Sequence, residues 1–304
     1  MSTKEIFEKF TQTTPFGGFP TSFKNSNYVI FGVPFDGTTS YYPGSRFGPD
    51  SIRQASLNIE TFNMVTKKDL EDELIFDMGN LILSPSDSNL MLNDVSDAVS
   101  FLISHKKIPI LLGGEHLVTL GSLKGAYKTL SDAQKTNFGI IHFDAHFDLR
   151  DELYGDKISH GTFMRRFVES TKASVLSVGI RAPSKEEFYY ANNNTKISFI
   201  TCEDIYTNFR NSLQIIKEFL SSKEIVYITF DMDVFSPSEV PGVGNPEPGG
   251  LNYFHVREII KTILNTHKKI IGFDVTELNP LVEGKISPTY AAKVVFDMLI
   301  FHQA

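Results

Sequence analysis

The sequence contains no tryptophan, a single cysteine and no long apolar segment. Cys202 alone cannot form an intramolecular disulfide, and an isolated cysteine more often packs as a small apolar side chain than acts as a nucleophile. No run reaches the ~20 apolar residues that a membrane-spanning helix needs, and Met1–Phe16 lacks the apolar core of a signal peptide. We therefore expect a cytoplasmic protein without a membrane partner.

A surplus of positive charge is also absent. The 304 residues include 29 lysines and arginines against 36 aspartates and glutamates, which gives a formal net charge of -7. This balance provides no electrostatic basis for binding nucleic acid or an anionic membrane surface. Hydrophobic residues make up 41% of the chain, which is enough to form the large buried core of a globular protein.

Short apolar runs alternate with segments of helical periodicity, a pattern typical of an α/β protein with a mostly parallel sheet. The runs predicted as buried strands are Tyr28–Val33, Ile108–Leu112, Phe138–Phe143, Val175–Gly179, Ile197–Thr201, Ile225–Phe230 and Ile270–Val275. The segments predicted as helices are Leu90–His105, Leu117–Leu130, Asn211–Leu220, Phe254–Leu264 and Tyr290–Phe301. No repeat or linker divides the chain, so we predict one domain over residues 1–304, with residues 1–27 as a surface arm.

Polar clusters follow four of the predicted strands. They are Gly113–His116, Asp144–Asp148, Asp231–Asp233 and Glu277–Pro280. The carboxyl ends of parallel strands share one edge of the sheet, where binding sites form. Ionisable groups at the end of a buried strand are costly unless they are paired or coordinated, and carboxylates gathered in one place repel one another. Because a bound cation relieves both penalties, the clusters predict a metal site.

The spacing of the charged residues predicts how they converge. Residues i and i+2 of a strand lie about 6.6 Å apart on the same face, so Asp144 and His146 can address one small volume, as can the two aspartates at 231–233. A continued strand would place Asp148 ~13 Å from Asp144, too far for a shared ion. If Asp148 is a ligand, the chain should therefore turn at Phe147.

Six candidate ligands are too many for one small ion and suit two cations bridged by carboxylates. They are His116, Asp144, His146, Asp148, Asp231 and Asp233. Two divalent cations would balance the four aspartates, and a bridging hydroxide would leave a negative charge suited to a cationic substrate. Oxygen and imidazole donors without a thiolate favour manganese over structural zinc, with iron, cobalt and nickel as alternatives. Each motif alone is common in turns and loops, so the metal interpretation rests on their joint occurrence.

At these positions the sequence resembles the ureohydrolase family of arginases, agmatinases and formiminoglutamases. The matching blocks are GGEH at 113–116, DAHFD at 144–148, SHGT at 159–162 and DMDVFSPSEVPGVGNPEPGGL at 231–251. A further block, GVPFDGTTSYYPGSRFGPDSIR at 32–53, looks most like the agmatinases. The resemblance implies a three-layer α/β/α fold around an eight-stranded, mostly parallel sheet. It also implies two manganese ions per chain and assembly as a homotrimer or homohexamer.

The resemblance further implies which residues hold each ion. One ion would be bound by His116, Asp144, Asp148 and Asp231. The other would be bound by Asp144, His146, Asp231 and Asp233. Asp144 and Asp231 would then bridge the two ions.

Three residues are expected to act on the substrate. Two cations would generate a bridging hydroxide that attacks the guanidinium carbon, and Asp148 would orient it. Glu277 would hold the guanidinium, and His160 would deliver a proton to the leaving amine. Outside this context Glu277 would be interpreted as a surface or capping acid and His160 as a loop histidine. His142, two residues before the metal motif, is a candidate support for a ligand.

Members of this family differ in the residues that bind the end of the substrate away from the guanidinium. An arginase-like loop rich in Asn and Ser, which would bind an amino-acid headgroup, is missing after Asp148. The loop that is present carries Asp151, Glu152 and Asp156, which could accommodate a cationic amine, although such acids are often only solvated. We therefore expect agmatine as substrate, cleaved to putrescine and urea as in polyamine biosynthesis.

Other features favour different substrates. Phe147 and Arg150 give the motif DAHFDLR, a form associated with formiminoglutamases, whose substrate carries carboxylates that Arg150, Arg165 and Arg166 could bind. Arginine, guanidinobutyrate and guanidine are further alternatives. A zinc-dependent deacetylase of related fold would hold one zinc per chain, whereas a non-catalytic relative would have lost ligands.

Overall fold

The computed structural model describes residues 3–266 and 268–302. Within them, eight parallel strands and one short antiparallel edge strand form the central sheet. Its spatial order is β1 (Phe10–Thr11), β5 (Ile75–Leu81), β2 (Tyr28–Val33), β6 (Ile108–Gly113), β11 (Lys269–Thr276), β10 (Ile225–Asp231), β7 (Phe138–Phe143), β8 (Ser174–Ile180) and β9 (Ile197–Thr201). The expected eight-stranded parallel sheet is confirmed, and β1 extends it at one edge.

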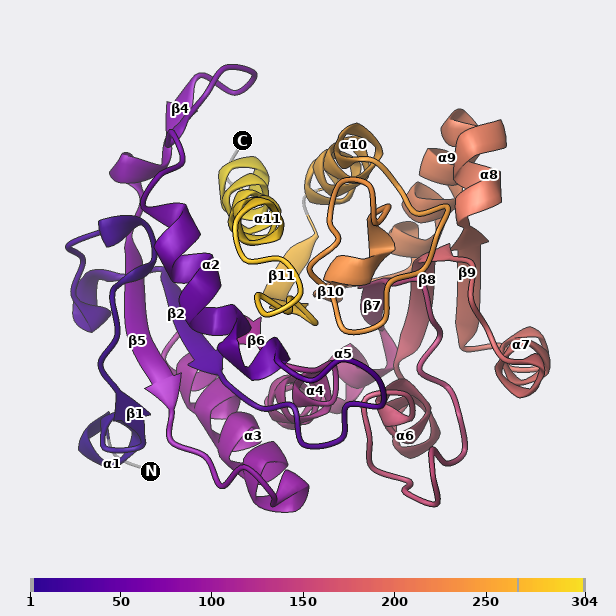
Figure 1. The fold of residues 1–304 in the computed structure, drawn as a ribbon, viewed down its shortest axis with the longest axis horizontal. Helices are drawn as coiled ribbons and strands as arrows, with labels where there is room; N and C mark the ends of the chain where they lie inside the picture. The colour runs from indigo at the N-terminus through magenta and orange to yellow at the C-terminus, as the bar shows by residue number, and fades with distance from the viewer. Residues whose placement is uncertain (1–2, 267, 303–304) are drawn as a thin grey trace.

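Helices cover both faces of this sheet (Figure 1). One layer contains α2 (Gly48–Ser56), α8 (Cys202–Thr207), α9 (Phe209–Ser221), α10 (Tyr253–Leu264) and α11 (Ile286–His302). The opposite layer contains α1 (Thr3–Phe7), α3 (Ser88–Ser104), α4 (Val118–Lys128) and α6 (Phe163–Ser170). Two further helices are α5 (Asp132–Thr136) and α7 (Lys185–Asn192). The result is the three-layer α/β/α arrangement that the resemblance implied.

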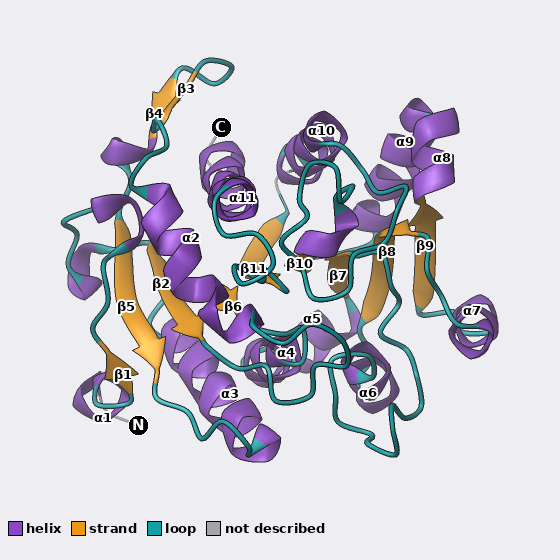
Figure 2. Cartoon of the chain, viewed as in Figure 1, coloured by secondary structure: helices purple, strands orange, loops and turns teal. Residues whose placement is uncertain are grey.

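Short elements complete the architecture. The 3-10 turns are η1 (Phe16–Gly18), η2 (Phe23–Asn25), η3 (Ser45–Phe47), η4 (Leu70–Asp72) and η5 (Met232–Val234). A two-stranded hairpin of β3 (Phe62–Asn63) and β4 (Lys68–Asp69) projects away from the sheet (Figure 2). None of the helices in the described part of the chain is long and apolar enough to cross a membrane.

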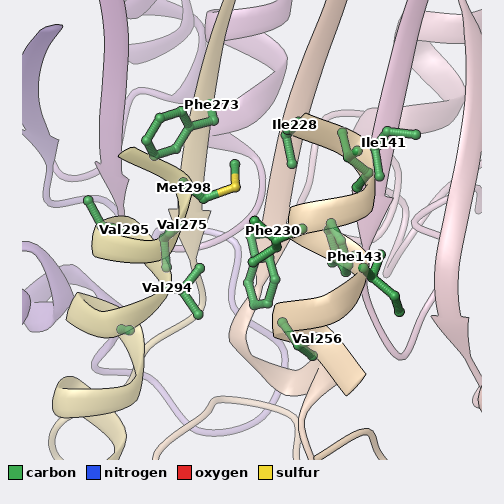
Figure 3. Packing of buried hydrophobic residues seen from close by; sticks show 14 of the residues in the cluster. Ile141, Phe143, Ile228, Phe230, Val256, Phe273, Val275, Val294, Val295 and Met298 are labelled. Atoms are coloured by element: carbon green, nitrogen blue, oxygen red, sulfur yellow. The ribbon is translucent and has the colours of Figure 1, made fainter. Parts of the chain in front are cut away.

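The strands form because they are apolar on both sides. Every residue of β2 is buried, and alternate side chains enter opposite layers, with Ile30 in one hydrophobic cluster and Phe31 in the other. In the first layer, Val294, Val295 and Met298 of α11 lie near Phe273 and Val275 of β11 (Figure 3). The helix α11 is apolar around most of its circumference because neighbouring helices and the sheet bury it.

The sequence prediction missed β5 and several short helices. All seven predicted strands and all five predicted helices are present, with bounds that differ by a few residues. β5 was missed because Asp77 and Asn80 interrupt its apolar pattern, and both accept hydrogen bonds from the buried side chain of Arg53. The N-terminal segment, predicted as a surface arm, adds β1 to the sheet through Phe10 opposite Leu81.

Candidate metal centre

The four polar clusters meet because their strands are neighbours. The order β6, β11, β10, β7 occupies the middle of the sheet, and each cluster follows the carboxyl end of one of these strands. Segments separated by more than 100 positions in the sequence therefore lie side by side. Most of the charged side chains that result are buried, which is costly unless a cation or a hydrogen-bonding partner compensates.

One group of ligand atoms surrounds the imidazole of His116. Its Nδ1 atom lies 3.1 Å from Asp144 Oδ2, 3.1 Å from Asp148 Oδ2 and 3.2 Å from Asp231 Oδ2. Among the described residues, His116 Nδ1 has no hydrogen-bond partner although it is buried. An octahedral ion ~2.1 Å from its ligands places neighbouring ligand atoms about 3 Å apart. The three distances from His116 Nδ1 therefore match the spacing of ligand atoms around one small cation.

A second group of ligand atoms surrounds His146. Its Nδ1 atom lies 3.0 Å from Asp233 Oδ2 and 3.4 Å from Asp144 Oδ1. Asp144 thus presents Oδ2 to the first group and Oδ1 to the second. The arrangement can hold a second cation next to the first, with the Asp144 carboxylate between them.

The explanation from strand geometry was wrong for both i, i+2 pairs. β7 ends at Phe143 and β10 at Asp231, so the remaining ligands lie beyond the strands. The His146 N–H donates to Asp144 Oδ1 at 2.5 Å, and the Asp233 N–H donates to Asp231 Oδ1 at 2.7 Å. These aspartate turns, rather than alternation along a strand, bring each pair together.

The chain also turns before Asp148, as the sequence predicted. Asp148 has a φ of 53°, a left-handed conformation that is uncommon outside glycine. The turn carries its carboxylate back to His116 Nδ1 at 3.1 Å. Strained backbone of this kind is concentrated at functional sites.

The protein groups alone disfavour ionisation of some of these carboxylates. Burial, together with the charge of Asp144, raises the pKa of Asp148 to about 6. Burial and the charges of Asp233 and Asp144 raise the pKa of Asp231 well above its usual range. A bound cation would favour the ionised forms. The electrostatics and the geometry therefore both suit a metal.

Buried groups behind His116 determine which of its ring nitrogens carries the hydrogen and which is free to bind a cation. His116 Nε2 lies 2.8 Å from Thr229 Oγ1, and the Thr229 hydroxyl donates to Asp274 Oδ1 at 2.6 Å. Thr229 can therefore only accept from Nε2–H, which leaves the lone pair of His116 on Nδ1. Asp274 also accepts from the hydroxyl of Tyr227 at 2.8 Å. Sequence analysis missed Asp274, although an aspartate inside a buried apolar run was a usable signal.

His142 contacts the shared aspartate. Its Nε2 lies 2.8 Å from Asp144 Oδ2 and its Nδ1 lies 3.1 Å from Ser177 Oγ. The histidine is fully buried. Its position agrees with the supporting role considered from the sequence.

A cavity of about 520 Å³ opens above the two groups of ligand atoms. Its lining includes all three residues expected to act on the substrate, His160, Glu277 and Asp148, and Asp148 is also one of the five predicted ligands in the lining. Glu277 is buried, and its Oε1 accepts the His116 backbone N–H at 2.7 Å. Burial, followed by the charge of Glu115, raises the pKa of Glu277 well above its usual range. Burial lowers the pKa of His160 to about 4.

Comparison with known proteins identifies the family. The family model described as "Arginase family" matches residues 26–301. The chain belongs to the arginase family. It is a hydrolase that acts on guanidino compounds, and the metal dependence of this family agrees with the two groups of ligand atoms.

Individual arginase-family proteins are similar over nearly the whole chain. The agmatinase of Halalkalibacterium halodurans is 35% identical over 92% of this chain and 93% of its own. The N(1)-aminopropylagmatine ureohydrolase of Thermococcus kodakarensis is 35% identical over 90% of both chains. The crystal structure of the agmatine ureohydrolase of Thermoplasma volcanium has a TM-score of 0.85 and 32% identity, covering 99% of this chain and 97% of that one.

The acidic loop of this arginase-family protein only partly faces the cavity. Of the three acids considered from the sequence, Glu152 lines the cavity. Asp151 instead accepts a hydrogen bond from Arg166 at 2.7 Å, and Asp156 accepts the Ile158 N–H at 2.8 Å. Of the three acids, Glu152 is therefore the one placed to meet a substrate in the described cavity, whereas Asp151 and Asp156 are held by hydrogen bonds outside its lining.

The three arginines considered from the sequence also differ in whether they line the cavity. Arg150 lines the cavity and its Nε lies 3.8 Å from Glu187 Oε2. Arg165 donates to Glu169 at 3.0 Å and to Glu186 at 2.7 Å. Neither Arg165 nor Arg166 belongs to the described lining of the cavity. Of these three arginines, Arg150 is the one that lines the described cavity.

Proposed function

We propose that this protein hydrolyses agmatine to putrescine and urea at two manganese ions. The observation that carries the proposal is the charge of the outer cavity. Beyond the candidate ligands and Glu277, the lining contains three carboxylates, those of Glu152, Glu187 and Glu247, and one guanidinium, that of Arg150. Agmatine carries a guanidinium at one end and an ammonium at the other, so its tail meets a negatively charged wall.

The ligand assignments combine the two groups of ligand atoms with the family resemblance, which alone implies that Asp231 also binds the second ion. His116, Asp148, Asp144 and Asp231 would hold one ion, and His146, Asp233, Asp144 and Asp231 the other. Four carboxylates with two imidazoles suit manganese. When bound, two such ions lower the pKa of water and supply the nucleophile.

The remaining chemistry belongs to side chains of the cavity. Glu277 would accept hydrogen bonds from the guanidinium and orient its carbon. The Asp148 carboxylate would orient the attacking water. His160, neutral because burial lowers its pKa to about 4, would take up a proton released in the attack and deliver it to the leaving amine. This sequence of transfers yields urea and putrescine.

A second candidate substrate is N(1)-aminopropylagmatine. The relative from Thermococcus kodakarensis bears that name, and a further cationic arm would offset the surplus of two carboxylates in the outer cavity. A third candidate, formiminoglutamate, is favoured only by Arg150, whose guanidinium already lies near Glu187.

Measuring the product formed from each candidate substrate distinguishes these activities. The manganese-loaded protein would be assayed for urea with agmatine, N(1)-aminopropylagmatine, arginine, guanidinobutyrate and guanidine, and for formamide with formiminoglutamate. We expect the highest kcat/KM with agmatine. Faster turnover of any other compound would reassign the substrate, and the absence of product from all six would overturn the proposed function.

The cellular setting and assembly are also proposals. Putrescine formation would place the reaction in polyamine biosynthesis in the cytoplasm, and the family resemblance favours a homotrimer or homohexamer. Sedimentation of the purified protein would test the assembly, and a monomer at micromolar concentration would contradict it.

A further inference from the structure

The loop between β2 and α2 approaches the cavity from a distant part of the sequence. It belongs to the block at 32–53 that resembles agmatinases, and in Figure 1 it extends from β2 across the molecule toward α6. Two anchors fix its shape. Asp36 accepts the Gly44 N–H at 2.8 Å and binds the Arg46 side chain. Asn279 donates to the carbonyl of Tyr42 at 2.9 Å.

Glu115 is the third anchor of this loop. Its carboxylate accepts the Thr38 N–H at 2.9 Å, the Thr38 hydroxyl at 2.7 Å and the Thr39 hydroxyl at 3.1 Å. The side chain is fully buried, and it is not part of the described lining of the cavity. Burial raises the pKa of Glu115 to about 7, while the bonds from Thr38 and Thr39 act in the opposite direction. The glutamate of the GGEH motif therefore binds the loop rather than a cation or the substrate.

Thr38 contacts His160 on its other side. The Thr38 oxygen accepts the His160 backbone N–H at 3.0 Å and lies 3.3 Å from His160 Nδ1. Because the Thr38 hydroxyl hydrogen is donated to Glu115, its oxygen can only accept from the ring, and Nδ1 must then carry the hydrogen. The second ring nitrogen, Nε2, lies 3.1 Å from Ser40 Oγ, and both residues line the cavity.

We propose that Glu115, Thr38 and Ser40 are positioning residues that fix the tautomer and orientation of His160, so that Nε2 is the nitrogen that exchanges a proton in the cavity. Glu115 orients the Thr38 hydroxyl, Thr38 accepts from Nδ1–H, and Ser40 donates to the free lone pair of Nε2. The catalytic part of this inference rests on the proposed function, whereas the tautomer does not.

The tautomer can be tested without substrate or metal. Protein labelled with 15N-histidine is examined by NMR at about pH 9, where a histidine ring is neutral, with His160→Asn used to assign the signal. We expect the Nδ1–H form in the wild type and in Thr38→Ser, which keeps the hydroxyl, and a mixture of forms in Thr38→Val, which keeps only the shape. An Nε2–H form in the wild type, or an unchanged signal in Thr38→Val, would overturn the proposal.

Kinetics of the metal-loaded variants test the consequence. We expect Thr38→Val and Glu115→Gln to lower kcat ~10-fold or more, since small displacements of catalytic groups cost this much, with KM and metal content within ~2-fold of wild type. Thr38→Ser should restore kcat. Thr39→Val removes a neighbouring hydroxyl that also binds Glu115 but does not touch His160. An equal loss in Thr39→Val would show that loop stability limits activity and would overturn the positioning role. If Thr38→Val changes the tautomer without changing kcat, the proton-transfer role of His160 in the proposed function fails while the structural inference stands.

Discussion

Glu277 and His116 are joined by a 2.7 Å hydrogen bond in which the His116 backbone N–H donates to Glu277 Oε1. The Glu277 N–H donates in turn to the carbonyl of Gly114 at 2.7 Å. Glu277 has a φ of 63°, which costs about 1 to 3 kcal/mol in a residue that is not glycine, and these two bonds help to hold it. The acid expected to bind the guanidinium is therefore placed by the same GGEH turn that supplies a candidate metal ligand.

Replacing Glu277 with glutamine should separate substrate orientation from metal binding. The amide oxygen can still accept the His116 N–H, so we expect both metals to remain bound. Loss of the charged contact to the guanidinium should lower kcat/KM by ~100-fold or more. Elemental analysis and urea release measure the two effects. Near-normal turnover would show that Glu277 does not hold the guanidinium.

Replacing Asp231 and replacing Asp233 should cause the loss of different numbers of metal ions. Asp231→Ala removes a proposed bridging ligand, so we expect loss of both ions and of activity. The Asp233 carboxylate lies beside His146 Nδ1 and is proposed as a ligand of one ion, so Asp233→Ala should retain about one ion per chain. Metal content after gel filtration tests both variants. Two ions bound to Asp231→Ala would contradict the bridging assignment.

Metal removal should destabilise the fold. An ion that binds only the folded state stabilises it by about 2.7 kcal/mol when its free concentration is 100-fold above its Kd. We expect a chelator to lower the melting temperature, and readdition of manganese to restore it with two ions per chain. An unchanged melting temperature, or binding of one zinc ion in place of two manganese ions, would argue against this centre.

The low pKa of His160 has a consequence for stability in the metal-free protein. Burial lowers the pKa to about 4 in the folded state, whereas an exposed histidine titrates near 6.5. Between these values the unfolded chain binds a proton that the folded chain does not, so this contribution is complete above about pH 6.5 and is lost as the pH falls toward 4. Urea denaturation of metal-free wild type and His160→Asn should show a smaller fall in stability for the variant between these pH values. Parallel curves would show that the fold does not hold His160 as a neutral ring.

The sequence predicted those strands and helices whose apolar pattern is visible within a single segment. Strands such as β10 are apolar on both faces, so their existence follows from composition and length. β5 was not recognised because its polar residues Asp77 and Asn80 bind groups from other segments, above all the side chain of Arg53 on α2. Hydrogen bonds between polar groups that are far apart in the sequence cannot be predicted from the residues of one segment.

The candidate site shows the same division. The charged residues of DAHFD and DMD were identified because several ionisable groups at strand ends are difficult to explain without a cation. Their actual geometry depends on turns beyond the strands, which spacing alone did not predict. Asp274 and Glu115 were not identified as functional, since each is a single acid whose partners are hydroxyl groups from other segments. A motif does not reveal which distant residue one of its members binds, and GGEH gives no sign that Glu115 binds Thr38.

The most demanding prediction concerns the far end of the substrate. We expect agmatine to be preferred over arginine by at least ~100-fold in kcat/KM, because burying an unpaired α-carboxylate costs several kcal/mol and each 1.4 kcal/mol corresponds to about tenfold. The structure supplies one cationic side chain to this part of the described cavity, Arg150, and its guanidinium already lies near Glu187.

Arg150→Ala and Glu152→Gln form a matched pair that distinguishes a cationic from an anionic tail. Both side chains line the cavity and neither belongs to the candidate ligand set. If the tail is an ammonium, Glu152→Gln should raise KM for agmatine ~2- to 10-fold through loss of one charge contact, whereas Arg150→Ala should leave KM unchanged or lower it. If the natural substrate carries carboxylates, Arg150→Ala should instead impair turnover of formiminoglutamate. Fast formiminoglutamate turnover by the wild type, with negligible agmatine turnover, would refute the agmatinase assignment but not the two-metal centre, because the ligand groups around His116 and His146 do not depend on the substrate's tail.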